Sequence, residues 1–558
     1  MSDVARSPLR EAERKADDAG EPAPTPAESA RALAGTVRST FGPNGRDKML
    51  VGSDGTVVVT NDGARVLDRL DVEDPVARVL SRAVRTQRAR VGDGATGTLL
   101  LVDELLSAAA SLVGDGYHAT TVVEGYALAA ARARERLPTH ELAVGASDGE
   151  RLRSVAKAAV TGRWDDAAAE RFAGLAVSGL RAVDFDASRL DLCAYPGGEL
   201  RESALLDGVL VDTDTSSTGV EDGAVEGPRT LVDARVAMLD AELTVETPRG
   251  TGSLGLNGPE ELDALREHER SVRTEAVRTL SEAGADVLFC QKSVDGAVRS
   301  ELARAGVLVV ERTRRDEFDA LARATGADPV MSVTDLAREN LGRADEVRRR
   351  TVGTADALAA TGGAGESRAT LLLRGGTPHV AEETERIVED CLALVRGALR
   401  DGGVLAGGGA AATALAGDLS SHARAVGGRE QAAVEAFADS LEAIPRQLAR
   451  NAGRDPVDAL VELRTRHHEG DSTVGVGRSG ALREMVEAGV LEPPSVLDST
   501  LATALETVSA VLRVDDVLAV DAADGPGSDG GSGGAGGGGS GAPPRSRATG
   551  GYPWAIGH

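Results

Sequence analysis

Two helix-rich stretches of the chain flank a middle stretch with a different pattern. Apolar residues recur at helical spacing over 98–113, 119–137, 379–400, 430–452 and 497–513. Between about 205 and 360, helical segments alternate with short β-like runs, namely GVLV, VAMLDAEL, ADVLFC and GVLVVE. Helical segments on either side of an insertion often form one discontinuous domain. The order therefore predicts a multidomain α+β protein.

Several local segments have their own signals. Residues 46–60 predict a β-hairpin, in which RDKMLV pairs with Val57-Val58-Val59 across a Ser53-Asp54-Gly55 turn. The polar, Gly-rich stretch 244–262 predicts a protruding loop, followed by a charged helix from Pro259. Residues 1–28 predict disorder at the start, and the Gly/Ser-rich composition from Asp521 onward predicts a flexible tail.

Composition bounds the class of protein. A chain of 558 residues with 41% hydrophobic residues can bury ordinary cores, so wholesale disorder is excluded. Its formal charge of 62 − 88 = −26 argues against a duplex nucleic-acid binder. Cys193, Cys290 and Cys391 lie far apart and fit neither a disulfide framework nor a zinc site. With no signal peptide and no run of about 18 apolar residues, we expect a cytoplasmic protein without a membrane partner.

The charged residues have a further bias. Lys15, Lys48, Lys157 and Lys292 are the only lysines among the 62 basic residues. Strong acidity with few lysines is typical of a proteome adapted to high salt, which screens self-repulsion. High-GC codon usage explains the lysine deficit equally well.

Two glycine-rich turns are candidate phosphate-binding segments. Gly42-Pro43-Asn44-Gly45 gathers backbone N–H groups, although no Lys-Ser/Thr pair follows as in a Walker A loop. Gly92-Asp93-Gly94-Ala95-Thr96 directly precedes a predicted helix, whose free N–H groups suit a phosphate. A carboxylate beside a phosphate requires a cation between them, so Asp93 is a candidate Mg²⁺ ligand. The alternative is that Asp93 simply caps the helix.

Two further carboxylates and two glycine runs are less specific signals of a binding or catalytic site. Asp62 begins another predicted helix, and the simpler interpretation is that it caps this helix. Asp390 lies on a largely apolar helix face, where a carboxylate is costly unless it serves a site. Gly407-Gly408-Gly409-Ala410 and the run 250–255 permit a dinucleotide-binding interpretation, but neither lies in a clear βαβ unit. No HExxH motif or Ser/His/Asp nucleophile set stands out.

Taken together, the ordered motifs resemble the group II chaperonin (thermosome) family over nearly the whole chain. The motifs are FGPNGRDKMLV at 41–51, VTNDGARVL at 59–67, VGDGATGTLL at 91–100, LFCQKSVD at 288–295, LLLRGGTPHVAEETER at 371–386, VLAGGGA at 404–410, AFADSLEAIPRQLARNAG at 436–453, GVLEP at 489–493 and VLRVDDVLA at 511–519.

The resemblance implies three domains, two of them discontinuous. A helical equatorial ATPase domain would combine 1–143 with 399–522, and an intermediate domain would combine 144–210 with 363–398. An α/β apical domain at 211–362 would carry a helical lid protrusion at 244–272, and 523–558 would form the tail. Such subunits assemble into two stacked rings, homo- or hetero-oligomeric, that enclose unfolded polypeptides.

The resemblance also implies the residues of an ATP site. The phosphate-binding set would comprise Gly42, Pro43, Gly92, Gly94, Thr96 and Thr98. Asp93 would bind Mg²⁺, while Asp62 and Asp390 would orient and activate the attacking water, with Asp390 as the base. Gly408 and Gly409 would pack against the nucleotide, and Glu492 would contact the ribose.

The sequence departs from the family pattern at the phosphate contacts. Ala95 and Gly97 stand where hydroxyl residues are usual, and Arg163 takes the place of a phosphate-reaching lysine. After Gly409-Ala410, alanine and threonine replace the usual glutamates at 411–414. We expect an ATP-driven folding chaperone. The alternative is a catalytically weak structural subunit of a mixed ring, and a Rossmann-type oxidoreductase is more distant.

Overall fold

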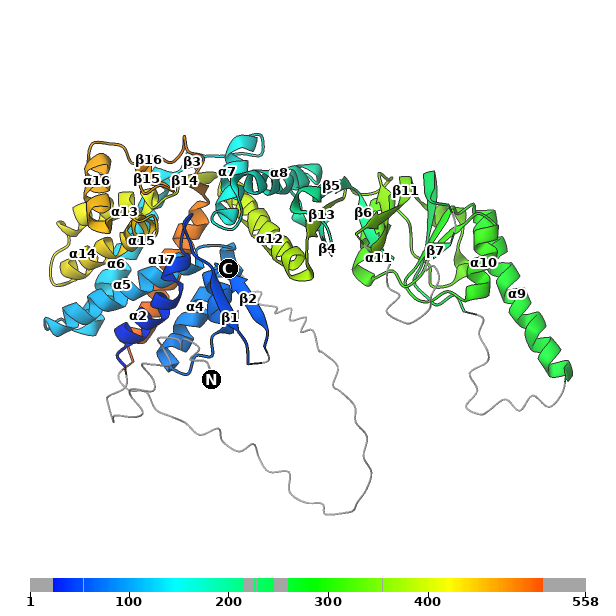
Figure 1. Cartoon of the computed structure of the whole chain (residues 1–558), viewed down its shortest axis with the longest axis horizontal. Helices are drawn as coiled ribbons and strands as arrows, with labels where there is room; N and C mark the ends of the chain where they lie inside the picture. Colours follow the sequence, from blue (N-terminus) through cyan, green and yellow to red (C-terminus); the bar gives the residue numbers. More distant parts are fainter. Residues whose placement is uncertain are drawn as a thin grey trace, which may run out of the picture. The chain divides into compact units, whose positions relative to one another are not determined.

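The computed structural model describes residues 24–53, 55–213, 225–226, 228–244, 259–353 and 355–514. Helices alternate with five separate β-sheets, and the mixed sheet content lies between two helical stretches of the chain (Figure 1). The multidomain α+β fold class is thereby confirmed. Residues 245–258 of the predicted loop 244–262, the predicted tail from Asp521 onward and most of the N-terminal 28 residues lie outside the described residues.

The largest hydrophobic core unites helices from both helical stretches. It contains buried side chains such as Leu33, Leu101, Tyr126, Phe437 and Leu501. The helices of this body are α2 (Pro26–Val37), α3 (Gly63–Arg69), α4 (Pro75–Val91), α5 (Ala95–Gly114), α6 (Ala119–Arg136), α13 (Ala410–Ala423), α14 (Glu430–Leu441), α15 (Ala443–Asn451), α16 (Pro456–His468) and α17 (Pro494–Leu512). Since α5 packs against α2, α14 and α17, the two helical stretches form one folded body.

Local sequence explains where these helices begin and end. Thr25 and Glu28 form a capping box at the start of α2, and Pro26 occupies its first position. The predicted helix over 430–452 is wrong in one respect, because the structure divides it into α14 and α15 at Glu442. Pro445 accounts for the break, since a proline ring clashes with the carbonyl four residues earlier, that of Leu441.

The predicted hairpin is present beside this body. Strands β1 (Lys48–Val51) and β2 (Val57–Thr60) pair antiparallel, with Lys48 opposite Thr60. Small sheets add β3 (Leu142–Ala143), β14 (Gly403–Ala406) and β17 (Leu491–Glu492), and also β15 (Val474–Val476) with β16 (Leu482–Glu484). Short 3-10 helices cover Arg38–Thr40, Leu137–His140, Ala187–Arg189, Leu200–Glu202, Val333–Asp335 and Arg338–Asn340.

A second core surrounds a three-stranded sheet. Strand β13 (Ala369–Gly375) pairs parallel with β4 (Leu190–Pro196) and antiparallel with β5 (Ala204–Asp207). Three helices share this core, namely α7 (Gly149–Val160), α8 (Asp166–Ala182) and α12 (Pro378–Asp401). The predicted helix 379–400 is therefore confirmed as α12.

The middle of the chain forms a seven-stranded sheet in the order β6-β12-β11-β8-β9-β10-β7. Its strands are β6 (Val209–Asp212), β7 (Val225–Glu226), β8 (Thr230–Leu239), β9 (Val287–Cys290), β10 (Leu308–Val310), β11 (Gly342–Val352) and β12 (Ala355–Thr361). Alternate residues of β8 face two cores: Val236 and Met238 pack with α11 (Arg315–Thr325), whereas Ala237 and Leu239 pack with α9 (Pro259–Ala283) and α10 (Gly296–Arg304). Figure 1 shows these helices on the two sides of the sheet.

Two helices qualify by length and composition as membrane spans, although neither is an uninterrupted run of about 18 apolar residues. They are Ala95–Gly114 and Pro494–Leu512, and just over half of each is buried inside the molecule. Both helices contribute buried side chains to the first core.

Candidate nucleotide-binding site

A cavity of about 550 Å³ lies where the two helical stretches meet the three-stranded sheet body. Segments far apart in the chain line it, including 40–43, 92–97, 157–164, 407–409 and 488–492. Every site residue predicted from the sequence lines this cavity except Thr98. The structure therefore gathers twelve of the thirteen predicted residues around one space.

Tight turns bring backbone into this cavity. Gly42 has a φ of 78°, and a Cβ there would lie 2.3 Å from Cδ2 of Leu448. The Gly45 N–H donates to the Gly42 carbonyl at 2.9 Å, which closes the turn around Pro43. A side chain at Gly42 would therefore fill space between the turn and α15.

Two helix N-termini without side-chain caps open into the same cavity. Helix α5 follows Gly94 and helix α13 follows Gly409, both in the left-handed conformation, and neither receives a side-chain capping bond. The first N–H groups of each helix lack intrahelical partners. Such groups, together with the helix dipole, favour an anionic ligand.

Asp93 and Asp62 behave differently at their helix starts. Asp93 Oδ1 accepts only from the neighbouring Gly94 N–H, at 2.6 Å, so Asp93 does not cap α5. Asp62 Oδ1 accepts from the N–H groups of Ala64 and Arg65 at 2.9 and 3.3 Å, so Asp62 does cap α3. Its second oxygen, Oδ2, is left to interact with groups in the cavity.

Asp62 and Asp390 share three arginines. Asp62 Oδ2 lies 2.6 Å from Nη1 of Arg88 and 2.6 Å from Nη1 of Arg386. Asp390 lies 3.5 Å from each of these guanidinium groups and 3.3 Å from Nη1 of Arg163. Arg163 also approaches Asp62, at 3.8 Å. Because these groups come from four separate segments, this ionic cluster joins the two bodies at the cavity.

The surroundings of the two carboxyl groups shift their pKa values in opposite directions. Burial alone would raise the pKa of Asp62, but Arg88, Arg163 and Arg386 outweigh it and hold that pKa below its ordinary value. Burial dominates at Asp390 and raises its pKa, with Asp62 adding to the increase against the same arginines. Asp62 is therefore the more firmly ionised of the two.

Asp93 and Glu492 form the other acidic part of the cavity. The Asp93 side chain is exposed to the cavity yet surrounded by protein, and this desolvation raises its pKa, with Asp390 adding to the effect. Desolvation also raises the pKa of Glu492 to about 8, and the nearby Asp93 contributes. A carboxylate pair in this environment gains stability from a bound cation.

The two predicted threonines occupy different surroundings. Thr98 is fully buried, and its hydroxyl donates to the Gly94 carbonyl at 2.9 Å and lies 3.2 Å from Oγ1 of Thr500. Thr96 lines the cavity beside Gly63, where a Cβ would lie 2.2 Å from Thr96 Oγ1. Thr96 is thus the threonine that faces the cavity.

Sequence reasoning missed two of the three arginines. Arg386 lies four residues before Asp390 on α12, so helical spacing alone puts the two side chains on one face. Arg88, near the end of α4, had no local signal because both of its carboxylate partners come from distant parts of the chain.

The donors of the cavity fit a nucleoside triphosphate with Mg²⁺. Two helix N-termini and the glycine turn provide N–H groups for phosphates, and Arg88 and Arg163 add positive charge. Among the described residues, no group of three or more His, Cys, Asp or Glu side chains is placed to hold a metal ion. Mg²⁺ beside a polyphosphate needs only one or two protein carboxylates, and Asp93 provides one.

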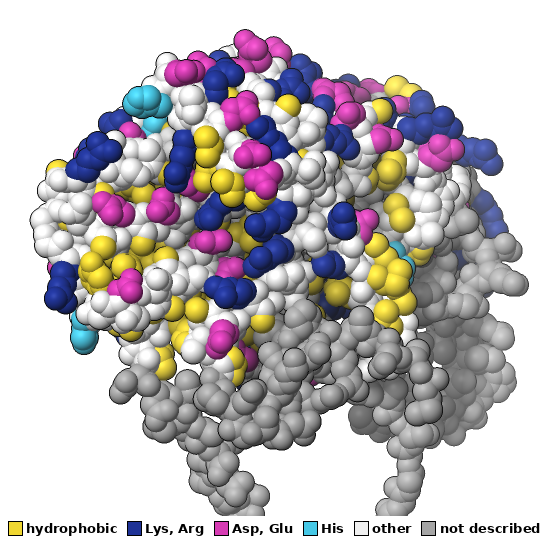
Figure 2. All heavy atoms as spheres, turned by 60° about the vertical axis from the view of Figure 1, so that its left-hand side comes forward, with side chains coloured by type: hydrophobic (Ala, Val, Ile, Leu, Met, Phe, Trp, Pro, Cys, Tyr) yellow, Lys and Arg dark blue, Asp and Glu magenta, His cyan; other side chains and the backbone are white. Residues whose placement is uncertain are grey.

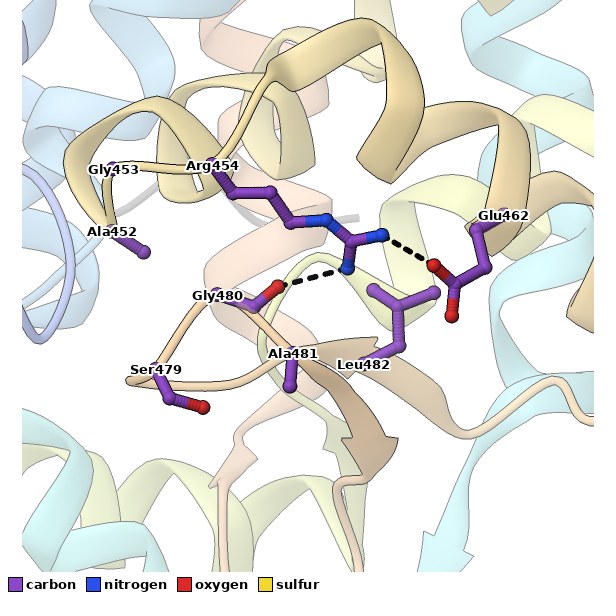
Figure 3. Close-up of a pocket in the computed structure, with 8 residues that line it drawn as sticks. All are labelled: Ala452, Gly453, Arg454, Glu462, Ser479, Gly480, Ala481 and Leu482. Carbon is purple, nitrogen blue, oxygen red and sulfur yellow. Dashed lines mark hydrogen bonds and ion pairs between the residues drawn. The ribbon is translucent and has the colours of Figure 1, made fainter.

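A second cavity, of about 480 Å³, shares none of these residues. Figure 3 shows it between the start of α16 and the β15–β16 turn. Arg454 spans it, donating to the Gly480 carbonyl at 3.0 Å and to Glu462. It is lined by none of the predicted site residues, so it is not the candidate site.

Known proteins resemble the chain over most of its length. A model of the TCP-1/cpn60 chaperonin family matches residues 33–522. The chain belongs to this family. It is 39% identical over 500 residues to a thermosome subunit of Methanopyrus kandleri, covering 88% of this chain and 90% of that one.

Two further relatives have similar identity to the chain. Identity is 40% to thermosome subunit alpha of Halobacterium salinarum, over 89% of this chain and 88% of the relative. It is 38% to thermosome subunit 1 of Haloferax volcanii, with the same coverage. The resemblance drawn from the sequence motifs is confirmed, as is the expectation of an ATP-dependent chaperonin function.

Proposed function

We propose that this chaperonin subunit hydrolyses Mg²⁺-ATP in the cavity and that the ionic cluster couples hydrolysis to closure between the two bodies. One observation carries the proposal: Asp62 before α3 and Asp390 on α12 meet through shared guanidinium groups beside two uncapped helix N-termini. Phosphoryl transfer to water needs a positioned nucleophile and neutralised phosphate charge, and these groups fit both needs.

We assign each part of the nucleotide to the residues placed to bind it. The phosphates would be held by the turn at Gly42 and Pro43, the α5 N-terminus from Gly92 to Thr96, and Arg163. Asp93 would hold Mg²⁺, which neutralises phosphate charge when bound. Gly408 and Gly409 would contact the nucleotide, and Glu492 its ribose.

Asp390 is the proposed proton acceptor. A base works best when its pKa is closer to the working pH, and burial raises the pKa of Asp390. Asp62, ionised and held by three arginines, would orient the water. Since Asp390 comes from α12 and Asp62 from the helical body, both reach the water only when the two bodies are together.

The three-domain division is part of the proposal. We propose an equatorial domain from 1–143 and 399–522, an intermediate domain from 144–210 and 363–398, and an apical domain at 211–362. The separate cores support three domains, although strand β6 pairs within the seven-stranded sheet and crosses the proposed boundary at 210. Thr98 would support the phosphate site without contacting the ligand, since its hydroxyl donates a hydrogen bond to the Gly94 carbonyl. Related subunits would form a cytoplasmic double ring that encloses unfolded polypeptide, at high salt.

The test measures ATP turnover by the purified full-length protein at molar salt. Loss of a general base lowers kcat by about a hundredfold or more, which is the expected result for Asp390→Asn. Glu382→Gln, an exposed carboxylate two turns earlier on α12, is the matched control and should retain wild-type turnover. If the assembled wild type shows no Mg²⁺-dependent hydrolysis, the structural-subunit alternative replaces the proposal.

A further inference from the structure

Arg88 is fixed by the end of its helix. Helix α4 stops at Val91 because Gly92 adopts the left-handed conformation and returns its N–H to the Arg88 carbonyl at 2.8 Å. The Arg88 side chain is 23% exposed and lines the cavity. The backbone therefore presents this guanidinium from the last turn of α4 directly to the site.

The ion pairs of Arg88 are with the two carboxylates of the proposed reaction. Nη1 donates to Asp62 Oδ2 at 2.6 Å, and Nη2 lies 3.5 Å from Asp390 Oδ1. Within the described part of the chain, no other carboxylate forms an ion pair with Arg88. The two terminal nitrogens of the planar guanidinium thus interact with different carboxylates.

The other two arginines are placed differently. Arg386 is also held by Glu383 on its own helix and is not among the cavity-lining residues. Arg163 lies in the loop between α7 and α8 and approaches Asp62 only at 3.8 Å. Arg88 is therefore the cavity-lining cation that holds Asp62 closely while also reaching Asp390.

Two carboxylates repel each other, and here they belong to separate folded bodies. A guanidinium shared between them offsets that repulsion and fixes their separation. Without Arg88, Arg386 still pairs with both carboxylates and Arg163 still pairs with Asp390, but Asp390 Oδ1 loses the guanidinium that lies 3.5 Å from it. The relative position of the two carboxylates would then be less well defined.

We propose that Arg88 is a positioning residue for ATP hydrolysis, whose guanidinium sets the spacing of Asp62 and Asp390 around the attacking water. This inference rests on the proposed function, because it assigns Arg88 a role through the two carboxylates. A positioning role predicts a loss in kcat with little change in substrate binding.

The experiment compares Arg88→Ala and Arg88→Lys with wild type in full-length, assembled protein. Turnover gives kcat and KM for ATP, and equilibrium binding of ADP is measured separately. For Arg88→Ala we expect kcat to fall about tenfold or more, with KM and the ADP dissociation constant within about threefold of wild type. Lysine has one ammonium group in place of the fork and should recover part of the loss.

Arg85→Ala is the matched control. Arg85 lies one turn earlier on α4 and pairs with Asp68 outside the cavity, so its loss should leave kcat unchanged. Added guanidinium ion should raise the kcat of Arg88→Ala but not of Arg85→Ala, an effect that a merely structural role would not produce.

The outcomes separate this inference from the proposed function. An unchanged kcat in Arg88→Ala, or a raised KM with normal kcat, overturns the positioning role while wild-type hydrolysis stands. Failure of both Arg88 variants to assemble also overturns it, since Arg88 would then be a structural residue. Absence of wild-type hydrolysis with intact ADP binding rejects the proposed function itself.

Discussion

Three aspartates in one cavity titrate differently because their neighbours differ. Asp62 has three guanidinium groups close enough to outweigh its burial, and its pKa is lowered. At Asp390 and Asp93 burial dominates and raises the pKa. Carboxyl groups whose environments separate their acidity can take different roles in one reaction. The cluster thus gives Asp62 and Asp390 pKa shifts in opposite directions, as the two roles proposed for them require.

Thr98 provides a prediction about the phosphate site. Its hydroxyl is buried and used within the protein, so Thr98→Val removes a buried hydrogen bond without removing a ligand contact. We expect a loss of about 1 kcal/mol in stability and an unchanged KM for ATP. The apparent thermal midpoint and steady-state kinetics measure the two effects.

Thr96→Val is the comparison for that prediction. Thr96 lines the cavity, so its variant should raise KM with little effect on the thermal midpoint. A rise in KM for Thr98→Val as large as that for Thr96→Val would place the Thr98 hydroxyl at the substrate after all.

At the residue scale, the sequence could supply candidates but not their geometry. Asp62 and Asp93 both precede helices, and spacing alone could not tell that only Asp62 forms capping bonds. The motif resemblance selected both correctly for the cavity. The position of Arg386 beside Asp390 could be predicted from helical spacing. Arg88 meets its partners only through tertiary packing, which no local sequence pattern predicts.

At the element scale, the glycines before α5 and α13 keep two helix ends open. At Gly409, with a φ of 81°, a Cβ would lie 3.0 Å from the Cα of Pro445. Gly409→Ala should therefore lower stability by roughly 1–2 kcal/mol, because left-handed backbone is unfavourable for alanine. The apparent thermal midpoint measures this loss, and it should be accompanied by weaker nucleotide binding.

Gly417→Ala tests the same change within α13. Gly417 lies inside the helix, and a Cβ there would meet no atom within 4 Å. Alanine should stabilise that position by roughly 0.5–1 kcal/mol. Equal effects of the two substitutions would mean that the conformation of Gly409 is not required.

Helix periodicity predicted the positions of α5, α6, α12 and α17 to within three residues, because apolar spacing is a local property. It could not predict that α14 and α15 are separate, since both halves of 430–452 keep the same apolar spacing. Pro445 was the available signal. Sheet order in the middle of the chain could not be predicted either, because the paired residues of β6 and β12 are at least 145 positions apart in the sequence.

Glu317 links α11 to the neighbouring strands and predicts a pH effect. Its Oε1 accepts from the Asp212 N–H at 3.3 Å, while the buried Oε2 has no hydrogen-bond partner. Burial raises the pKa of Glu317 from 4.5 to about 7, against the Asp212 hydrogen bond and the charge of Arg314. The folded protein therefore binds a proton there more tightly than the unfolded chain does.

Stability should consequently decrease as the pH rises from about 4.5 to about 7, by on the order of 3 kcal/mol from this group. Glu317→Gln removes the ionisation, so its thermal midpoint should exceed that of wild type increasingly up to pH 7 and by a constant amount above it. Asp319→Asn, on the same helix, is the control. A difference that does not vary with pH would contradict the assignment.

At the scale of the whole molecule, acidic and basic side chains are interspersed. Figure 2 shows both kinds scattered over one face, with apolar groups between them and no continuous basic patch. Many charged side chains of the molecule form ion pairs at the surface, such as Arg134 with Asp498 and Arg466 with Asp471. Pairing leaves an excess of 26 negative charges, which must repel those of any neighbouring copy.

That excess makes assembly the property most sensitive to salt. The Debye length is about 10 Å at 0.1 M and about 3 Å at 1 M ionic strength, so molar salt confines repulsion to close contacts. If related subunits form the proposed rings, sedimentation velocity should show large assemblies at molar KCl and free subunits near 0.1 M. Sucrose at matched osmolality, which does not screen charge, should not restore assembly. Intact rings at 0.1 M would reject the inference that the acidic surface is adapted to high salt, whereas dissociation reversed by KCl alone would attribute assembly to screening.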